Sequence, residues 1–149
     1  MKVVVDTNVV FSGILKSSGK IGKILINSRP HFQFYSCDFL RAEILKHRNK
    51  LLKLTKLSEL ELIELETLVT KNISFINEGL LPQALIQSTE TLLKGIDQSD
   101  TPFVALTKHL EAKLWTGDMR LLTGLKAKRF NDVISTAELS LMLDDLEKE

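Results

Sequence analysis

The chain opens with Met1-Lys2-Val3-Val4-Val5-Asp6-Thr7-Asn8, in which three β-branched residues lead directly to a carboxylate. An uninterrupted apolar run of this kind is typical of a strand buried on both faces of a parallel sheet. We therefore predict a central strand over residues 3–5 that ends at Asp6. A carboxylate at the end of a buried strand is costly unless it is paired or binds a metal. The sequence shows no packing purpose for it.

Strand and helix patterns alternate along the rest of the chain. Period-two alternation and short apolar runs predict further strands over residues 32–36, 73–76, 113–116 and 132–134. Capping residues and helical spacing predict helices that begin near Gly19, Asp38, Ser58, Pro82, Asp100, Asp118 and Ser135. Alternating strands and helices are typical of an α/β fold with a mostly parallel sheet.

Length and composition limit the class of protein. The 149 residues suit one domain, which we expect to span residues 1–149. A content of 44% hydrophobic and 26% charged residues is typical of a soluble globular chain and argues against a disordered one. The 20 basic and 19 acidic residues nearly cancel, so the net charge of +1 does not by itself indicate a nucleic-acid binder.

Cys37 is the only cysteine, which excludes an intrachain disulfide and a multi-cysteine zinc cluster. We interpret it as a buried structural residue rather than a catalytic thiol. No apolar run approaches the roughly 18–20 residues of a membrane span, and Asp6 comes too soon for a signal-peptide core. We therefore expect a cytoplasmic protein.

Five carboxylates gather near the predicted carboxyl ends of the strands, where parallel sheets bind ligands. They are Asp6, Glu43, Asp97, Asp100 and Asp118. Convergent carboxylates raise each other's pKa values unless a cation neutralises them. Mg²⁺ and Mn²⁺ prefer such oxygen ligands, and they support the hydrolysis of phosphodiesters. The three histidines have no metal-ligand spacing such as H-x-x-x-H.

Each carboxylate also has a plainer interpretation. Asp100 before Thr101-Pro102 is a plausible helix cap, and Asp118 after Gly117 is a plausible turn or cap residue. Glu43 is a plausible solvated helix residue with a partner three or four positions along. The set is therefore more specific than any of its members.

Three motifs resemble those of PIN-domain nucleases of a bacterial and archaeal, toxin-type subgroup. They are Val3-Val4-Val5-Asp6-Thr7-Asn8-Val9, Ile96-Asp97-Gln98-Ser99-Asp100-Thr101-Pro102-Phe103-Val104-Ala105-Leu106 and Trp115-Thr116-Gly117-Asp118. Arg41-Ala42-Glu43-Ile44 stands where that family carries a glutamate. The order and spacing match from Val3 to about Leu143.

The resemblance implies a three-layer α/β/α sandwich with a mostly parallel central sheet. It also implies a ribonuclease that cleaves single-stranded RNA and needs Mg²⁺ or Mn²⁺. The catalytic, metal-binding acids carried over are Asp6, Glu43, Asp100 and Asp118, with Asp97 as an extra acid that substitutes for Asp100 or joins it. Many relatives are the toxin of a toxin–antitoxin pair and many dimerise, so an antitoxin and a second copy are the expected partners.

Other positions of the motifs carry supporting roles in this resemblance. Asn8 and Thr116 resemble the polar neighbours that orient ligands or water. Arg120 stands where many relatives have a further acid. In this interpretation Arg120 contacts phosphate, and the second metal site lacks one of its acids.

Basic residues are concentrated between Arg41 and Lys56, where only Glu43 is acidic. Lys46, Arg48 and Lys50 of this run, with Arg120, are candidates to hold an RNA backbone. The alternative is a solvated helix face with blocks of charge. Phe39, Tyr35 and Trp115 are able to stack on bases, but we interpret them as core.

Two other function classes remain open on the sequence. One is a haloacid-dehalogenase-like phosphatase in which Asp6 is the nucleophile, although Asn8 stands where that family normally has an acid. The other is a non-catalytic module that binds RNA or protein and leaves RNA intact.

Overall fold

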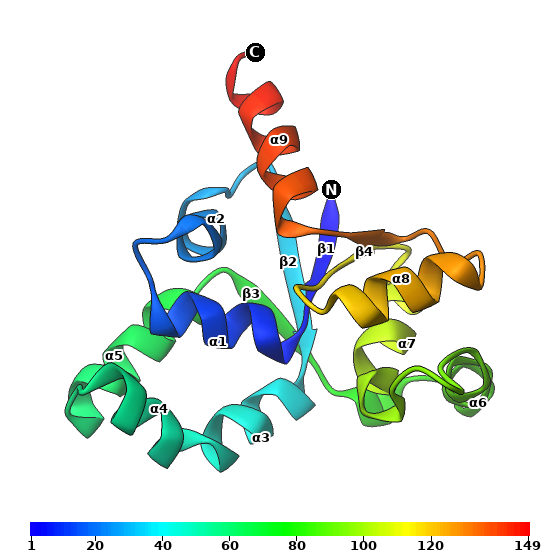
Figure 1. Ribbon diagram of the computed structural model, residues 1–149, viewed down its shortest axis with the longest axis horizontal. Coiled ribbons are helices and arrows are strands. Elements are labelled where there is room, and N and C mark those ends of the chain that lie inside the picture. The colour runs from blue at the N-terminus through cyan, green and yellow to red at the C-terminus, as the bar shows by residue number, and fades with distance from the viewer.

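The valine run forms the middle strand of a five-stranded sheet in a computed structural model, which describes residues 1–149 (Figure 1). The strands are β1 (Lys2–Val5), β2 (Gln33–Cys37), β3 (Ile73–Ile76), β4 (Lys113–Trp115) and β5 (Val133–Ile134). Their order across the sheet is β3-β2-β1-β4-β5, and every pairing is parallel. Val3, Val4 and Val5 are fully buried. The predicted central strand and the parallel sheet are therefore confirmed.

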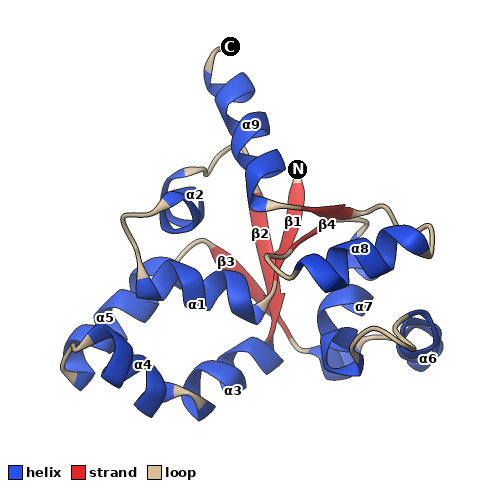
Figure 2. Ribbon diagram, in the orientation of Figure 1, coloured by secondary structure: helices blue, strands red, loops and turns tan.

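Helices connect the strands and cover the sheet, giving the expected three-layer α/β/α sandwich. In Figures 1 and 2, α1 to α5 lie on one side of β1 and α6 to α8 on the other. The helices are α1 (Thr7–Leu15), α2 (Lys20–Asn27), α3 (Asp38–Lys46), α4 (Arg48–Thr55), α5 (Glu59–Thr70), α6 (Gln83–Leu92), α7 (Thr101–Leu110), α8 (Met119–Ala127) and α9 (Thr136–Glu147). None of them is long and apolar enough to cross a membrane.

Local capping signals placed several helices correctly. Ser58 and Ser135 both make the predicted capping boxes, at the starts of α5 and α9. Asp118 caps α8 by accepting hydrogen bonds from the backbone N–H groups of Arg120 and Leu121. Pro82 is the residue before α6 rather than part of its first turn.

Helices α1 and α4 were not predicted. Thr7–Leu15 contains Val9 and Val10, whose β-branching favours strand in isolation, yet both are buried on one side of a helix. Asp6 begins that helix, because its carboxylate accepts a hydrogen bond from Val9 N at 2.9 Å. Asp6 therefore has a structural role that the sequence did not indicate, as the N-cap of α1.

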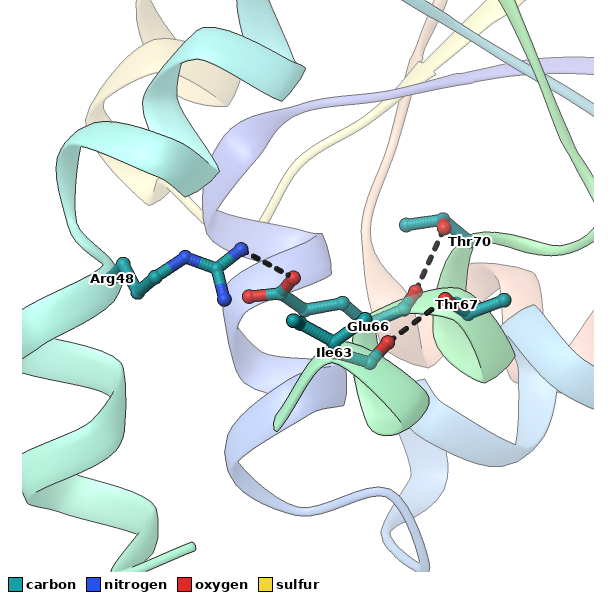
Figure 3. A network of polar contacts seen from close by, with 5 residues as sticks. All are labelled: Arg48, Ile63, Glu66, Thr67 and Thr70. Carbon is teal, nitrogen blue, oxygen red and sulfur yellow. Dashed lines mark hydrogen bonds and ion pairs between the residues drawn. The ribbon is translucent and has the colours of Figure 1, made fainter. Parts of the chain in front are cut away.

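The basic run and the acidic run after it form two neighbouring helices. Arg48 on α4 places Nη2 3.0 Å from Oε2 of Glu66 on α5, and both side chains are largely buried (Figure 3). In the same view, the hydroxyls of Thr67 and Thr70 donate to backbone carbonyls one turn earlier. One ion pair thus joins the basic helix α4 to the acidic helix α5.

Candidate active site

All five predicted carboxylates line one cleft of about 320 Å³ at the carboxyl edge of the sheet. Its lining comes from α1 and its cap, from α3 and the residue after it, from α7 and the segment before it, and from the start of α8. The lining residues are Asp6, Thr7, Asn8, Phe11, Phe39, Glu43, His47, Asp97, Ser99, Asp100, Phe103 and Asp118. The convergence expected from the strand ends is therefore present.

Asp6 is the most buried of these acids, at 3% exposed. Burial raises its pKa from 3.8 to about 6, and the negative charge of Asp118 adds to the rise. Hydrogen bonds from the Thr116 side chain and from the Val9 and Asn8 backbone oppose it. The hydroxyl of Thr116 also accepts from Asp118 N at 3.0 Å, so this buried side chain connects two acids of the cleft.

Asp100 occupies the N-cap position of α7, but its side chain makes no capping hydrogen bond. Its Oδ2 atom is buried and has no hydrogen-bond partner. Burial raises its pKa to about 7, and the charges of Asp97, Asp6 and Asp118 raise it further. Interpretation as a simple helix cap thus fails, because the carboxylate stabilises no backbone group and is repelled by three neighbours.

Asp118 and Asp97 each have a local structural partner as well as a place in the cleft. Asp118 caps α8 through Oδ1. Asp97 accepts from the backbone N–H and the hydroxyl of Ser99, and these hydrogen bonds lower its pKa. The turn that contains Asp97 therefore stabilises its ionised form, close to Asp100.

Glu43 faces the cleft from α3 with its side chain 20% exposed. Its Oε2 lies 3.3 Å from Nε2 of His47, four residues along the chain. The predicted partner at this spacing exists, but the pair lines the cleft rather than an open surface. The ring of His47 in turn meets Phe11 of α1 edge-on, with centroids 5.6 Å apart.

Several cleft residues were missed on the sequence: Thr7, Phe11, His47, Ser99 and Phe103. The spacing of Phe39, Glu43 and His47 at four-residue intervals was the available signal, because such residues share one face of a helix. Phe11 gave no signal, since α1 itself was not predicted.

Asn8 and Phe39 also line the cleft, so Phe39 is only in part the core residue that was expected, and the remaining candidates do not line it. Trp115 is fully buried and donates Nε1–H to the Thr136 hydroxyl, as expected for a core residue. Cys37 is buried too, and burial raises the pKa of its thiol to about 12. Arg48 turns toward Glu66, whereas Lys46, Lys50 and Arg120 are exposed.

The donor set of the cleft suits a hard divalent cation. No three acidic, histidine or cysteine side chains stand close enough together to be assigned as a metal site. Asp6 and Asp100 nevertheless have raised pKa values through burial and neighbouring carboxylates, and Oδ2 of Asp100 has no partner, so an added cation would be attracted to these acids. Carboxylate oxygens are also the ligands that Mg²⁺ and Mn²⁺ prefer.

Comparison with known proteins concerns the family and the fold. A family model described as PIN domain matches residues 4–142. Among solved structures, the chain is similar to a protein chain in the crystal structure of VapBC2 from Rickettsia felis, which is bound to a DNA fragment from the VapBC2 promoter. The TM-score is 0.63 and the sequence identity is 14%, and the match covers 91% of this chain and 97% of the Rickettsia felis chain. At this identity the likeness concerns the fold alone. A search of curated proteins gives no match.

Proposed function

Because this chain belongs to the PIN-domain family, we propose that it is a metal-dependent endoribonuclease that cleaves single-stranded RNA. PIN domains are generally nucleases, and family membership argues against the phosphatase alternative. The observation that carries the proposal is Asp100, a partly buried acid whose free oxygen has no structural partner. Such an atom lowers stability unless a ligand binds it.

The acids proposed to hold the cation are Asp6, Glu43, Asp100 and Asp118, with Asp97 beside them. A bound Mg²⁺ or Mn²⁺ ion would lower the pKa of an attacking water and offset charge on the phosphate and the leaving oxygen. Thr116 would hold Asp6 and Asp118 in fixed relative positions, because its hydroxyl forms hydrogen bonds with both residues. Asn8 would orient ligands or water from the first turn of α1.

Exposed cations beside the cleft would hold the RNA backbone. Lys46 and Lys50 flank His47, which lines the cleft, and Arg120 follows Asp118 by two residues. Each would contribute a non-specific, salt-dependent contact with phosphate. Arg48 contributes less, because Glu66 already neutralises its charge.

We also propose the biological setting of a cytoplasmic toxin with a protein antitoxin and a second copy of itself as partners. The family match and the likeness to a chain of the VapBC2 complex support this setting. An antitoxin would restrain the nuclease until it is removed.

The test is cleavage of a pool of single-stranded RNAs with Mn²⁺, with Mg²⁺ and with chelator. Wild-type protein should cut with either ion and not with chelator, and Asp6→Asn should be folded but inactive. Asp145→Asn is the matched control, because Asp145 is an exposed acid on α9 away from the cleft. Cleavage by Asp6→Asn at the wild-type rate would refute the assignment.

A further inference from the structure

The carboxylates occupy only part of the cleft, and aromatic rings line the rest. Phe39 on α3 and Phe11 on α1 are both partly exposed there, although each has the apolar bulk to be buried in the core. His47 completes this lining with its side chain 36% exposed. Here "aromatic wall" means Phe11, Phe39 and His47.

The aromatic wall is held by contacts behind and beside it. Phe39 meets the buried ring of Phe103 at a centroid distance of 5.9 Å and an interplanar angle of 66°. Phe11 meets His47 at 5.6 Å and 83°. These near-perpendicular contacts hold the rings in place, and both phenylalanines remain part of the cleft lining.

The spacing of the wall places it next to the acids. Phe39 and Glu43 are four residues apart on α3, and His47 follows at the same interval as the C-cap of that helix. The helix face that lines the cleft therefore presents a ring and then a carboxylate about 6 Å further along the axis, and the second ring stands at its end. Phe11 lies five residues after Asp6 on the helix that Asp6 caps. The rings and the carboxylates therefore line the same cleft.

A phosphodiester with an attached planar base matches this pairing of surfaces. We propose that the aromatic wall stacks a nucleobase next to the phosphate held at the acids, and so makes Phe11 and Phe39 residues that bind and position the substrate. This inference rests on the proposed function, because it assigns the base-binding part of the same cleft. Bases of a duplex are stacked on their neighbours and unable to lie on the wall, so the wall also selects single strands.

Binding to a strand that stays intact tests the wall independently of catalysis. A short 2′-O-methyl RNA and its abasic counterpart, each labelled with fluorescein, are titrated with protein and followed by fluorescence anisotropy. The titration uses Ca²⁺, which takes the same oxygen ligands as Mn²⁺, and a gel run afterwards checks that each strand is uncut. Wild type should bind the strand with bases roughly tenfold or more tightly than the abasic strand, given the usual strength of base–aromatic stacking. Phe11→Leu and Phe39→Leu, singly and together, should reduce that ratio toward one.

Two further variants control for bulk and for aromaticity. Phe39→Trp keeps a stacking face and should retain the ratio, whereas Phe75→Leu removes a partly buried ring of β3 outside the cleft and should leave it unchanged. Each variant is checked for folding by its thermal transition, and the single variants decide the matter if the double variant does not fold.

The proposal is overturned if wild type binds both strands equally, or if Phe11→Leu and Phe39→Leu keep the full ratio. Failure of the proposed function shows separately, as absence of cleavage of the unmodified RNA by wild type. A base-dependent ratio in such a protein would support the aromatic wall alone.

Discussion

Replacing Asp6 by asparagine should stabilise the protein while it abolishes cleavage. Asp6 is 3% exposed and its pKa rises from 3.8 to about 6. A rise of this size means that the ionised Asp6 lowers the free energy of unfolding by about 3 kcal/mol. Asparagine has no charge to bury, and its side-chain oxygen still accepts from Val9 N, since asparagine caps helices as well as aspartate does.

The sign of the pH dependence follows from the raised pKa. Below the unfolded pKa both states are protonated, and Asp6 costs nothing. As the pH rises from about 4 to about 6, the unfolded chain loses its proton first, so the free energy of unfolding of wild type falls. The advantage of Asp6→Asn should therefore be nearly absent at about pH 4 and complete at about pH 8.

Urea unfolding with chelator at these two pH values measures the effect. At about pH 8 the variant should gain about 3 kcal/mol, or roughly 6–12 °C in Tm. The exposed control Asp145→Asn should stay within about 0.5 kcal/mol of wild type at both pH values. A variant that is less stable than wild type at about pH 8, or a difference independent of pH, would refute the reasoning.

Three further predictions concern packing, the thiol and the cation. Gly22→Ala should lower the free energy of unfolding in urea by about 1–3 kcal/mol, because the Cβ of the new alanine would lie 2.3 Å from the Ser17 carbonyl oxygen. The control Gly117→Ala places its Cβ in open space and should be neutral or stabilising. Equal losses of stability in the two variants would contradict this reasoning. Cys37 should react with Ellman's reagent at about pH 8 only after unfolding, because its thiol is buried and its pKa is raised to about 12. Rapid labelling of the native protein would contradict this prediction. Mn²⁺ should raise the melting temperature of wild type by mass action but not that of Asp100→Asn, and an equal rise in both would place the ion elsewhere.

Local sequence signals were sufficient for most of the architecture. The valine run, the two capping boxes and the cap at Asp118 each depend on residues close in the chain, and the structure contains all of them. Helix α1 was missed because Val9 and Val10 favour strand locally, and only burial against neighbouring elements makes their helix favourable. Helix α4 was missed because basic residues dominate its sequence and hide its apolar face. The helix is held by Leu51, which is buried in the core, and by the ion pair between Arg48 and Glu66.

The acids of the cleft were predictable, whereas the unpartnered state of Asp100 and the aromatic part of the lining were not. The positions of Asp6, Glu43 and Asp118 relative to strand ends were enough to expect convergence. The absence of any capping bond at Asp100 depends on the geometry of the turn from Gln98 to Asp100, which no local pattern specifies. The aromatic wall depends on α1 lying against the junction of α3 and α4, a contact between segments far apart in sequence.

The most direct measurement of the central claim is the Mn²⁺-dependent cleavage rate of one defined single-stranded RNA by Asp100→Asn. The Asp100 side chain makes no hydrogen bond in the fold, so its replacement removes a proposed cation ligand without removing a structural contact. We predict a fully folded protein whose cleavage falls by at least about 100-fold, while Asp145→Asn cleaves at the wild-type rate. A folded Asp100→Asn that cleaves as fast as wild type would contradict the role of Asp100 as a cation ligand, and a wild type that does not cleave in Mn²⁺ would contradict the metal-dependent nuclease assignment.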